Sequence, residues 1–302
     1  MVQSAISFDR DWLRFIKGYT DASIGTEEIN LIKKMPISNI PPEILQNIFE
    51  HFSSNLPLLL ICALVNCSWC AVAIPILWRN PFRVAPKQNR LVDTYFKCFD
   101  KKTQMRILGK KGLHDNTLLR NDLIFETAKQ PMFRYASFLR VLDIENIYRA
   151  ITSWTPHPPN AIDITSWFPR CLPKTNYQLQ QLFVSEFFRF LWHESVVIQQ
   201  LIIGRYEFQR QTLLTHFWTL PIATECFSKL SSLHLMDLEP AFPADFFSFL
   251  ESNCHHIRHI YIASSLTKGL TRVASFIKAQ KHLHSIRLKS PNSSSPIILS
   301  AT

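Results

Sequence analysis

The sequence predicts an α/β protein, in which a bundle of three helices precedes a solenoid of strand–helix units. Two observations carry this prediction. Residues 40–83 hold three successive apolar segments with helical spacing. Beyond residue 136, a short apolar pattern suited to a strand returns five times, with helical stripes between its copies. The chain can build a core for both parts, because 47% of its residues are hydrophobic.

The first helical segment begins at a pair of prolines. Pro41 and Pro42 suit a first helical turn, where the backbone N–H is not needed. The apolar residues that follow lie on one helical face: Ile44, Leu45, Ile48, Phe49 and Phe52. Polar residues and a proline at 53–57 break this helix. The run 58–67 is apolar nearly all round, as expected of a second helix buried among others.

A third helix is expected to carry Trp69 and to reach Leu77. Its apolar positions continue the pattern through Val72 and Ile76. Pro75 lies inside this stretch, and because proline lacks a backbone N–H we expect it to kink or restart the helix.

Together these segments resemble an F-box. F-box domains open with Leu-Pro-x-Glu, here Ile40-Pro41-Pro42-Glu43, and continue with an Ile-Phe pair, here Ile48-Phe49. They carry Val-x-x-x-Trp, here Val65 to Trp69, and often finish at Leu-Trp, here Leu77-Trp78. The chain departs from the family at Ile40, where leucine is usual, and just before Trp69, where a basic residue is common. The alternative is a generic three-helix core element.

The resemblance assigns residues 38–84 to the F-box and implies an adaptor role. F-box helices dock on an Skp-family adaptor, and through it on a cullin–RING ubiquitin ligase, while the rest of the chain holds a client protein. Docking needs exposed apolar anchors. The residues expected to provide them are Ile40, Pro41, Pro42, Leu45, Ile48 and Phe49.

A basic connecting region is expected at 85–135, with no regular structure. Residues 87–140 hold twelve Lys/Arg and five Asp/Glu, a net charge of +7. The clusters Lys101-Lys102 and Lys110-Lys111 suit either a solvated face or a contact with an acidic partner. Nucleic-acid binding is not expected, despite a net charge of +10 for the chain, because no aromatic-plus-basic recognition motif accompanies the charge.

Residues 136–290 repeat the pattern apolar-x-x-apolar-x-apolar, which marks the strands. Its copies are Leu139-Leu142-Ile144, Ile198-Leu201-Ile203, Leu230-Leu233-Leu235, Ile257-Ile260-Ile262 and Leu283-Ile286-Leu288. The middle positions lie 59, 32, 27 and 26 residues apart. Leucine-rich repeats span about 20–29 residues, so this region resembles an atypical leucine-rich-repeat domain without the usual asparagine. An irregular α/β domain without true repeats is the alternative.

Helices are expected between these strands. Their apolar stripes run from Leu179 to Leu191, from Phe246 to Leu250 and from Val273 to Ile277. The long first interval has room for two repeats, or for one repeat with an insertion around the Pro-rich segment 154–173. Combined with the F-box, this arrangement resembles the ubiquitin-ligase receptors of the F-box/leucine-rich-repeat class.

The client surface is expected on the strands. Residues that flank the central apolar position of each pattern point away from the core. They are Gln200, Ile202, Ser232, His234, Met236, His259, Tyr261, Ser285, Arg287 and Lys289. The client-binding candidates among them are His234, His259, Tyr261, Arg287 and Lys289, whose imidazole, aromatic and basic groups favour an acidic or mixed-polarity client.

The two ends of the chain are expected to be peripheral. Residues 1–37 form a polar lead-in, in which Phe8, Trp12 and Phe15 fall at helical spacing. Residues 291–302 are expected to be a disordered tail. Since no obvious cap closes the repeats, a truncated repeat protein is one interpretation of this end.

No enzymatic activity, metal or cofactor is expected. Cys67-x-x-Cys70 has no second cysteine pair, which a zinc site would need. Cys254-His255-His256 with His259 is a second cluster of possible metal ligands, but it is not expected to bind a metal, because side chains alternate along a strand and His259 and Ile260 therefore face opposite ways. Nucleophile-elbow, phosphate-loop and dinucleotide motifs are absent from the sequence. The seven scattered cysteines suit free thiols in the cytoplasm or nucleus.

Two further functional hypotheses stay open beside the ligase receptor. One is an interaction scaffold that holds an adaptor without ubiquitin transfer, and the other is a basic protein associated with nucleic acid. No membrane association is expected, because the longest apolar run, 56–65, is shorter than the roughly 20 residues that span a bilayer.

Overall fold

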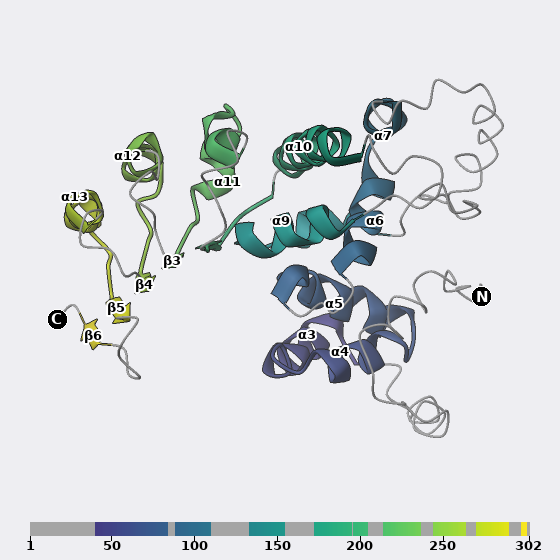
Figure 1. Cartoon of the computed structure of the whole chain (residues 1–302). Coiled ribbons are helices and arrows are strands. Elements are labelled where there is room, and N and C mark those ends of the chain that lie inside the picture. The colour runs from purple at the N-terminus through teal and green to yellow at the C-terminus, as the bar shows by residue number, and fades with distance from the viewer. Residues whose placement is uncertain are drawn as a thin grey trace.

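The computed structural model describes residues 40–83, 88–109, 133–154, 172–194, 196–204, 214–236, 244–263, 270–289 and 297–300. Within these residues, a group of helices precedes a region in which strands and helices alternate around one six-stranded sheet (Figure 1). The lead-in expected at 1–37 lies outside the described residues. No described helix combines the length and the apolar character needed to cross a bilayer.

Three helices form where the sequence predicts them: α3 (Pro42–His51), α4 (Leu56–Ala63) and α5 (Cys67–Leu77). Asparagine caps two of them, since Asn55 Oδ1 accepts the Leu58 N–H at 3.2 Å and Asn66 Oδ1 accepts the Trp69 N–H at 2.9 Å. Pro75 lies inside α5 without ending it. The following turn keeps its backbone bonding, because the Trp78 N–H donates to the Ile74 carbonyl at 3.0 Å.

The prediction of an irregular connection at 85–135 is wrong for its first part. Two helices form there, α6 (Gln88–Cys98) and α7 (Lys101–Gly109), whereas 110–132 lie outside the described residues. The helical stripe is short and lies among basic residues, so charge conceals it in the sequence. It buries Leu91, Val92 and Tyr95, and the Tyr95 ring lies 5.0 Å from that of Phe187 and 5.5 Å from that of Trp78.

A backbone connection joins the helical region to the sheet. After α5 come two 3-10 turns, η2 (Pro81–Arg83) and η4 (Tyr135–Phe138). The N–H groups of Arg140 and Val141 both donate to the Arg79 carbonyl at 2.9 Å. The end of the third helix is thereby attached to the start of the first strand.

The sheet runs in chain order. Its strands are β1 (Val141–Asp143), β2 (Gln200–Ile203), β3 (Ser232–Met236), β4 (His259–Ala263), β5 (Ser285–Lys289) and β6 (Ile297–Ser300). The first five pair in parallel, and the middle position of every pattern is in register with the next, from Leu142 to Leu201, Leu233, Ile260 and Ile286. The predicted strands and their register are confirmed.

Helices connect successive strands. They are α9 (Ile144–Ser153), α10 (Leu172–His193), η7 (Leu214–Thr219), α11 (Ala223–Phe227), α12 (Ala244–Asn253) and α13 (Leu270–Ala279). Figure 1 shows α10 to α13 in a row along one side of the strands. Because β1 pairs directly with β2, the long first interval is one unit with an insertion. Most of that insertion, 155–171, lies outside the described residues.

The alternating strand positions separate core from surface. All pattern positions of the first four strands are buried, including Leu201, Leu233 and Ile260. In β5 the equivalent residues Ile286 and Leu288 are only half-buried. The residues expected to form a disordered tail, 291–302, include β6, which pairs antiparallel with β5. That expectation is wrong for 297–300, because an apolar β-branched run can satisfy the free backbone edge of β5.

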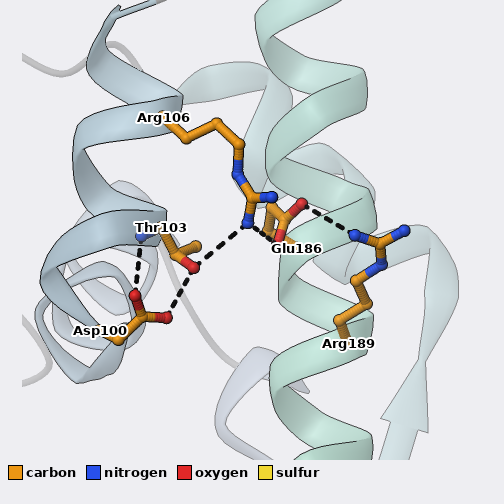
Figure 2. Close-up of polar contacts among 5 residues, drawn as sticks. All are labelled: Asp100, Thr103, Arg106, Glu186 and Arg189. Atoms are coloured by element: carbon orange, nitrogen blue, oxygen red, sulfur yellow. Dashed lines mark hydrogen bonds and ion pairs between the residues drawn. The ribbon is translucent and has the colours of Figure 1, made fainter.

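A polar network fastens α7 to α10 (Figure 2). Asp100 caps α7 by accepting from the Thr103 N–H at 2.9 Å and the Thr103 hydroxyl at 2.6 Å, and these bonds lower the pKa of its carboxyl group. Arg106 donates to Glu186 at 2.7 Å, while Arg189 approaches the other Glu186 oxygen at 3.5 Å. Glu186 is 6% exposed, so these partners provide the hydrogen bonds that water would otherwise give its carboxylate.

Arg106→Ala is expected to lower the free energy of unfolding by about 1–3 kcal/mol, because it removes the closest donor from a buried carboxylate. Arg189→Ala is the matched control and should have the smaller effect, since its contact is longer and its side chain is 59% exposed. Urea unfolding followed by circular dichroism measures both. Equal losses in the two variants would show that Arg106 has no special part in holding α7 against α10.

Candidate functional site

The apolar stripe of α3 divides between the core and the surface. Leu45 and Phe49 are each 1% exposed, and the Phe49 ring packs edge-on against Trp69 at 5.3 Å. By contrast, Ile44 is 50% exposed, Ile48 41% and Phe52 36%. Ile44 and Ile48 lie in α3 and Phe52 is its C-cap residue, so the three follow one another at intervals of four, and we call them the α3 apolar row.

The predicted docking residues are therefore not equivalent. Pro41, Pro42 and Ile48 are exposed, and Ile40 is half-buried. Leu45 and Phe49 are buried in the domain's own core, so the expectation that they serve as surface anchors is wrong.

Ile44 and Phe52 are exposed apolar residues that the sequence reasoning left out of the docking set. Both residues belong to the apolar helical stripe that the sequence shows at 44–52. Periodicity alone could not tell which half of a wide stripe faces inward.

Arg79 positions α3. Its guanidinium donates to both Glu50 oxygens at 2.5 Å, and this pairing lowers the pKa of the Glu50 carboxyl. Bidentate pairing fixes direction as well as distance. Because the Arg79 carbonyl also receives the two N–H groups before β1, a single residue links the α3 apolar row to the sheet.

The strand residues predicted to hold a client lie on neighbouring rungs. His234 is opposite Tyr261, and Tyr261 is opposite Arg287. The His234 and Tyr261 rings are 5.5 Å apart, and His234 Nε2 lies 3.1 Å from Gln200 Nε2. Burial, followed by the charge of Arg287, lowers the pKa of His234. The neutral imidazole is thus the favoured form at this position.

A second row of paired strand residues lies two residues earlier on each strand and faces the same side of the sheet. It joins Ser232, His259 and Ser285, and His259 Nδ1 lies 2.9 Å from the Ser285 hydroxyl. Lys289 is opposite Ala263, two residues beyond Arg287. The predicted grouping of Tyr261, Arg287 and Lys289 on adjacent strands is confirmed, and their binding of a client stays a prediction. His259, Arg287 and Lys289 are exposed, whereas His234 and Tyr261 are half-buried.

Burial disfavours the thiolate form of several described cysteines. Burial raises the pKa of Cys70 to about 11 and that of Cys254 to about 12. Cys67 is exposed, whereas Cys62 and Cys226 are buried. Within the ranges that the structure describes, no group of three or more His, Cys, Asp or Glu side chains could hold a metal ion.

Comparison with known families matches one part of the chain. The F-box-like family matches residues 37–84, which span α3, α4 and α5. Neither the comparison with curated proteins nor that with solved structures gives a match. The chain therefore has an N-terminal F-box-like domain, followed by an α/β region with a parallel sheet.

Proposed function

We propose that this protein is the substrate receptor of an SCF-type cullin–RING ubiquitin ligase. In this proposal the F-box-like domain docks on an Skp-family adaptor, and the α/β region, acting as a leucine-rich-repeat-like solenoid, holds a client protein. The chain performs no chemistry itself. Its contribution is to raise the effective concentration of client lysines near the ubiquitin-charged enzyme.

The α3 apolar row is the observation that carries the adaptor half of the proposal. F-box domains typically bind Skp-family adaptors, and the F-box-like match includes this helix. Ile44, Ile48 and Phe52 are the larger part of the big apolar side chains exposed in the described residues, the others being Met105 and Ile222. A contiguous apolar row on one helix suits a protein partner, because buried apolar anchors dominate interface energies.

The parallel sheet supports the client half. The strands follow one another in chain order, and the helices α11, α12 and α13 that connect β2 to β5 lie in a row on one side, which leaves the opposite side of the strands for a ligand. The polar and basic residues on the rungs of Tyr261 and His259 occupy that side. Tyr and Arg are also the residue types most often found as interface hot spots.

Ile48→Ala is expected to weaken adaptor binding by about thirtyfold, because truncating a buried interface anchor costs about 2 kcal/mol or more. Gln46→Ala is the matched control, since it lies on α3 away from the apolar row and should bind normally. Affinity is measured by co-purification and titration with an Skp-family adaptor. Unchanged binding of the Ile48 variant would contradict docking through the α3 apolar row.

Ligase assembly needs a second measurement. Adaptor and cullin should co-purify with the wild-type chain, and both should be lost together from the Ile48→Ala variant. An adaptor without a cullin would contradict the receptor role and favour a scaffold that transfers no ubiquitin.

A further inference from the structure

Acidic residues are absent from the C-terminal part of the sequence. After Glu251 the chain contains no Asp or Glu, whereas it contains seven Lys/Arg and five His. All 23 Asp/Glu of the chain lie at or before Glu251, so the complete absence of acidic residues is particular to this end. The last two parallel strands, β4 and β5, both lie in this segment.

The fold stacks the histidines of this segment in pairs. The His284 and Ser285 N–H groups donate to the Arg258 carbonyl at 2.8 and 3.0 Å, which sets the two strand entries side by side. The rings of His256 and His282 then lie 6.0 Å apart, and those of His259 and His284 lie 6.2 Å apart. We call these the two imidazole pairs. All four histidines are exposed.

The charged groups around the imidazole pairs are almost all basic. Arg258, Lys281 and Arg287 belong to the same strands or strand entries, and all three are exposed. The neighbouring elements add Lys229 before β3, Lys278 in α13, the half-buried His234 in β3, and two acids in α12, Asp245 and Glu251. Within the described residues of this surface, no carboxylate lies on β3, β4, β5 or β6.

From this arrangement we propose that the surface formed by the entries and open face of β4 and β5 captures an extended acidic segment of a protein. We also propose that the two imidazole pairs make this capture stronger as the pH falls. This inference rests on the proposed client-binding role of the sheet, and it names the chemistry of the client.

Strand geometry favours an acidic peptide over a nucleic acid. Arg287 and Lys289 lie two residues apart on one strand, a separation of about 6.6 Å, which alternate carboxylates of an extended peptide reproduce. Binding of single-stranded nucleic acid relies on exposed aromatic rings for base stacking. The aromatic residues after Glu251 are Phe276, which is buried, and Tyr261, which is half-buried against His234.

The pH dependence follows from linkage. Imidazole is the side chain that changes its charge within the physiological pH range. Two adjacent imidazolium rings repel each other, and carboxylates bound beside them offset that repulsion. Binding of an acidic segment is therefore coupled to proton uptake, so affinity rises on acidification. Arg258 and Arg287 stay charged throughout and provide the part of the binding that does not depend on pH.

The test uses the full chain and a fluorescein-labelled peptide of alternating glutamate and serine, about ten residues long. Fluorescence polarisation should show affinity rising about fivefold or more between about pH 7.5 and about pH 6.0. His259→Gln combined with His284→Gln should reduce that rise, and adding His256→Gln and His282→Gln should remove the rest of it. Arg287→Gln should weaken binding at both pH values.

Matched controls separate a specific surface from general charge. The variant Lys101→Gln with Lys102→Gln removes two exposed cations from α7 and should bind the peptide normally. The proposal is overturned if the peptide does not bind, if the α7 variant loses as much affinity as Arg287→Gln, or if the glutamine version of the peptide binds equally. Tighter binding of a single-stranded oligonucleotide, with loss in the same variants, would overturn it in favour of a nucleic-acid surface.

Adaptor binding is measured on the same preparations. Loss of peptide capture with intact adaptor binding would overturn this inference alone. Normal peptide capture by a chain that binds no adaptor would contradict the proposed ligase function and leave this inference standing.

Discussion

Leu233→Ala and Ile260→Ala should each lower the free energy of unfolding by roughly 2–5 kcal/mol. Both side chains are buried, at 0% and 1% exposure, and they face each other across β3 and β4 in the centre of the sheet. Truncation removes transfer free energy and leaves a cavity that a close-packed core fills only in part. Urea unfolding followed by far-UV circular dichroism measures the loss.

The neighbouring residues provide the control for this prediction. His234→Ala and Tyr261→Ala lie one position later, on the other side of the strands, and should change stability by less than about 1 kcal/mol. Their rings contact each other at 5.5 Å, so the small loss should come mainly from that contact. A larger loss in His234→Ala than in Leu233→Ala would show that the strand register is shifted by one residue.

Phe49→Ala should destabilise the F-box-like domain by about 3–5 kcal/mol. Its ring is 1% exposed and lies against Trp69, so the truncation opens a cavity between α3 and α5. Adaptor binding should also fall, because the helix that carries the α3 apolar row loses its support. Differential scanning calorimetry of the full chain measures the change in thermal unfolding.

Ile48→Ala separates the effect on docking from the effect on stability, since Ile48 is the residue just before Phe49 on the same helix and is exposed. It should leave stability within about 0.5 kcal/mol of the wild type while losing the adaptor. If Phe49→Ala melted like the wild type, the assignment of Phe49 to the core would be wrong. If Ile48→Ala melted early, its loss of adaptor binding would no longer report on docking.

The strands show how far a local pattern reaches. The spacing apolar-x-x-apolar-x-apolar predicted five strands and their register, from Leu142 to Ile286, because side chains alternate along a strand and only one alternation buries the apolar set. The same alternation placed Tyr261 opposite Arg287. In the N-terminal domain, proline, asparagine caps and apolar spacing predicted three helices for a similar local reason.

Patterns that depend on distant partners were missed or misassigned. The apolar stripe of α6 is buried partly by Phe187, which is far away in the sequence and provides the ring against which Tyr95 packs. The strand β6 forms because β5 has a free backbone edge with which it can pair. The residues 291–302 by themselves do not indicate that this edge is available. Glu186 has an unremarkable place on a helical stripe, and its burial requires Arg106 from α7.

By itself, the sequence determined the F-box-like helices, the strands, and which side chains of each strand face the core, because these follow from periodicity within a few residues. Only the tertiary structure decided that Phe49 packs inward while Ile44 and Phe52 stay at the surface, since that division depends on where Trp69 and α5 lie. It also decided that the histidines of two strand entries meet as pairs. Contacts between segments depend on how whole elements pack, and local spacing does not encode that packing.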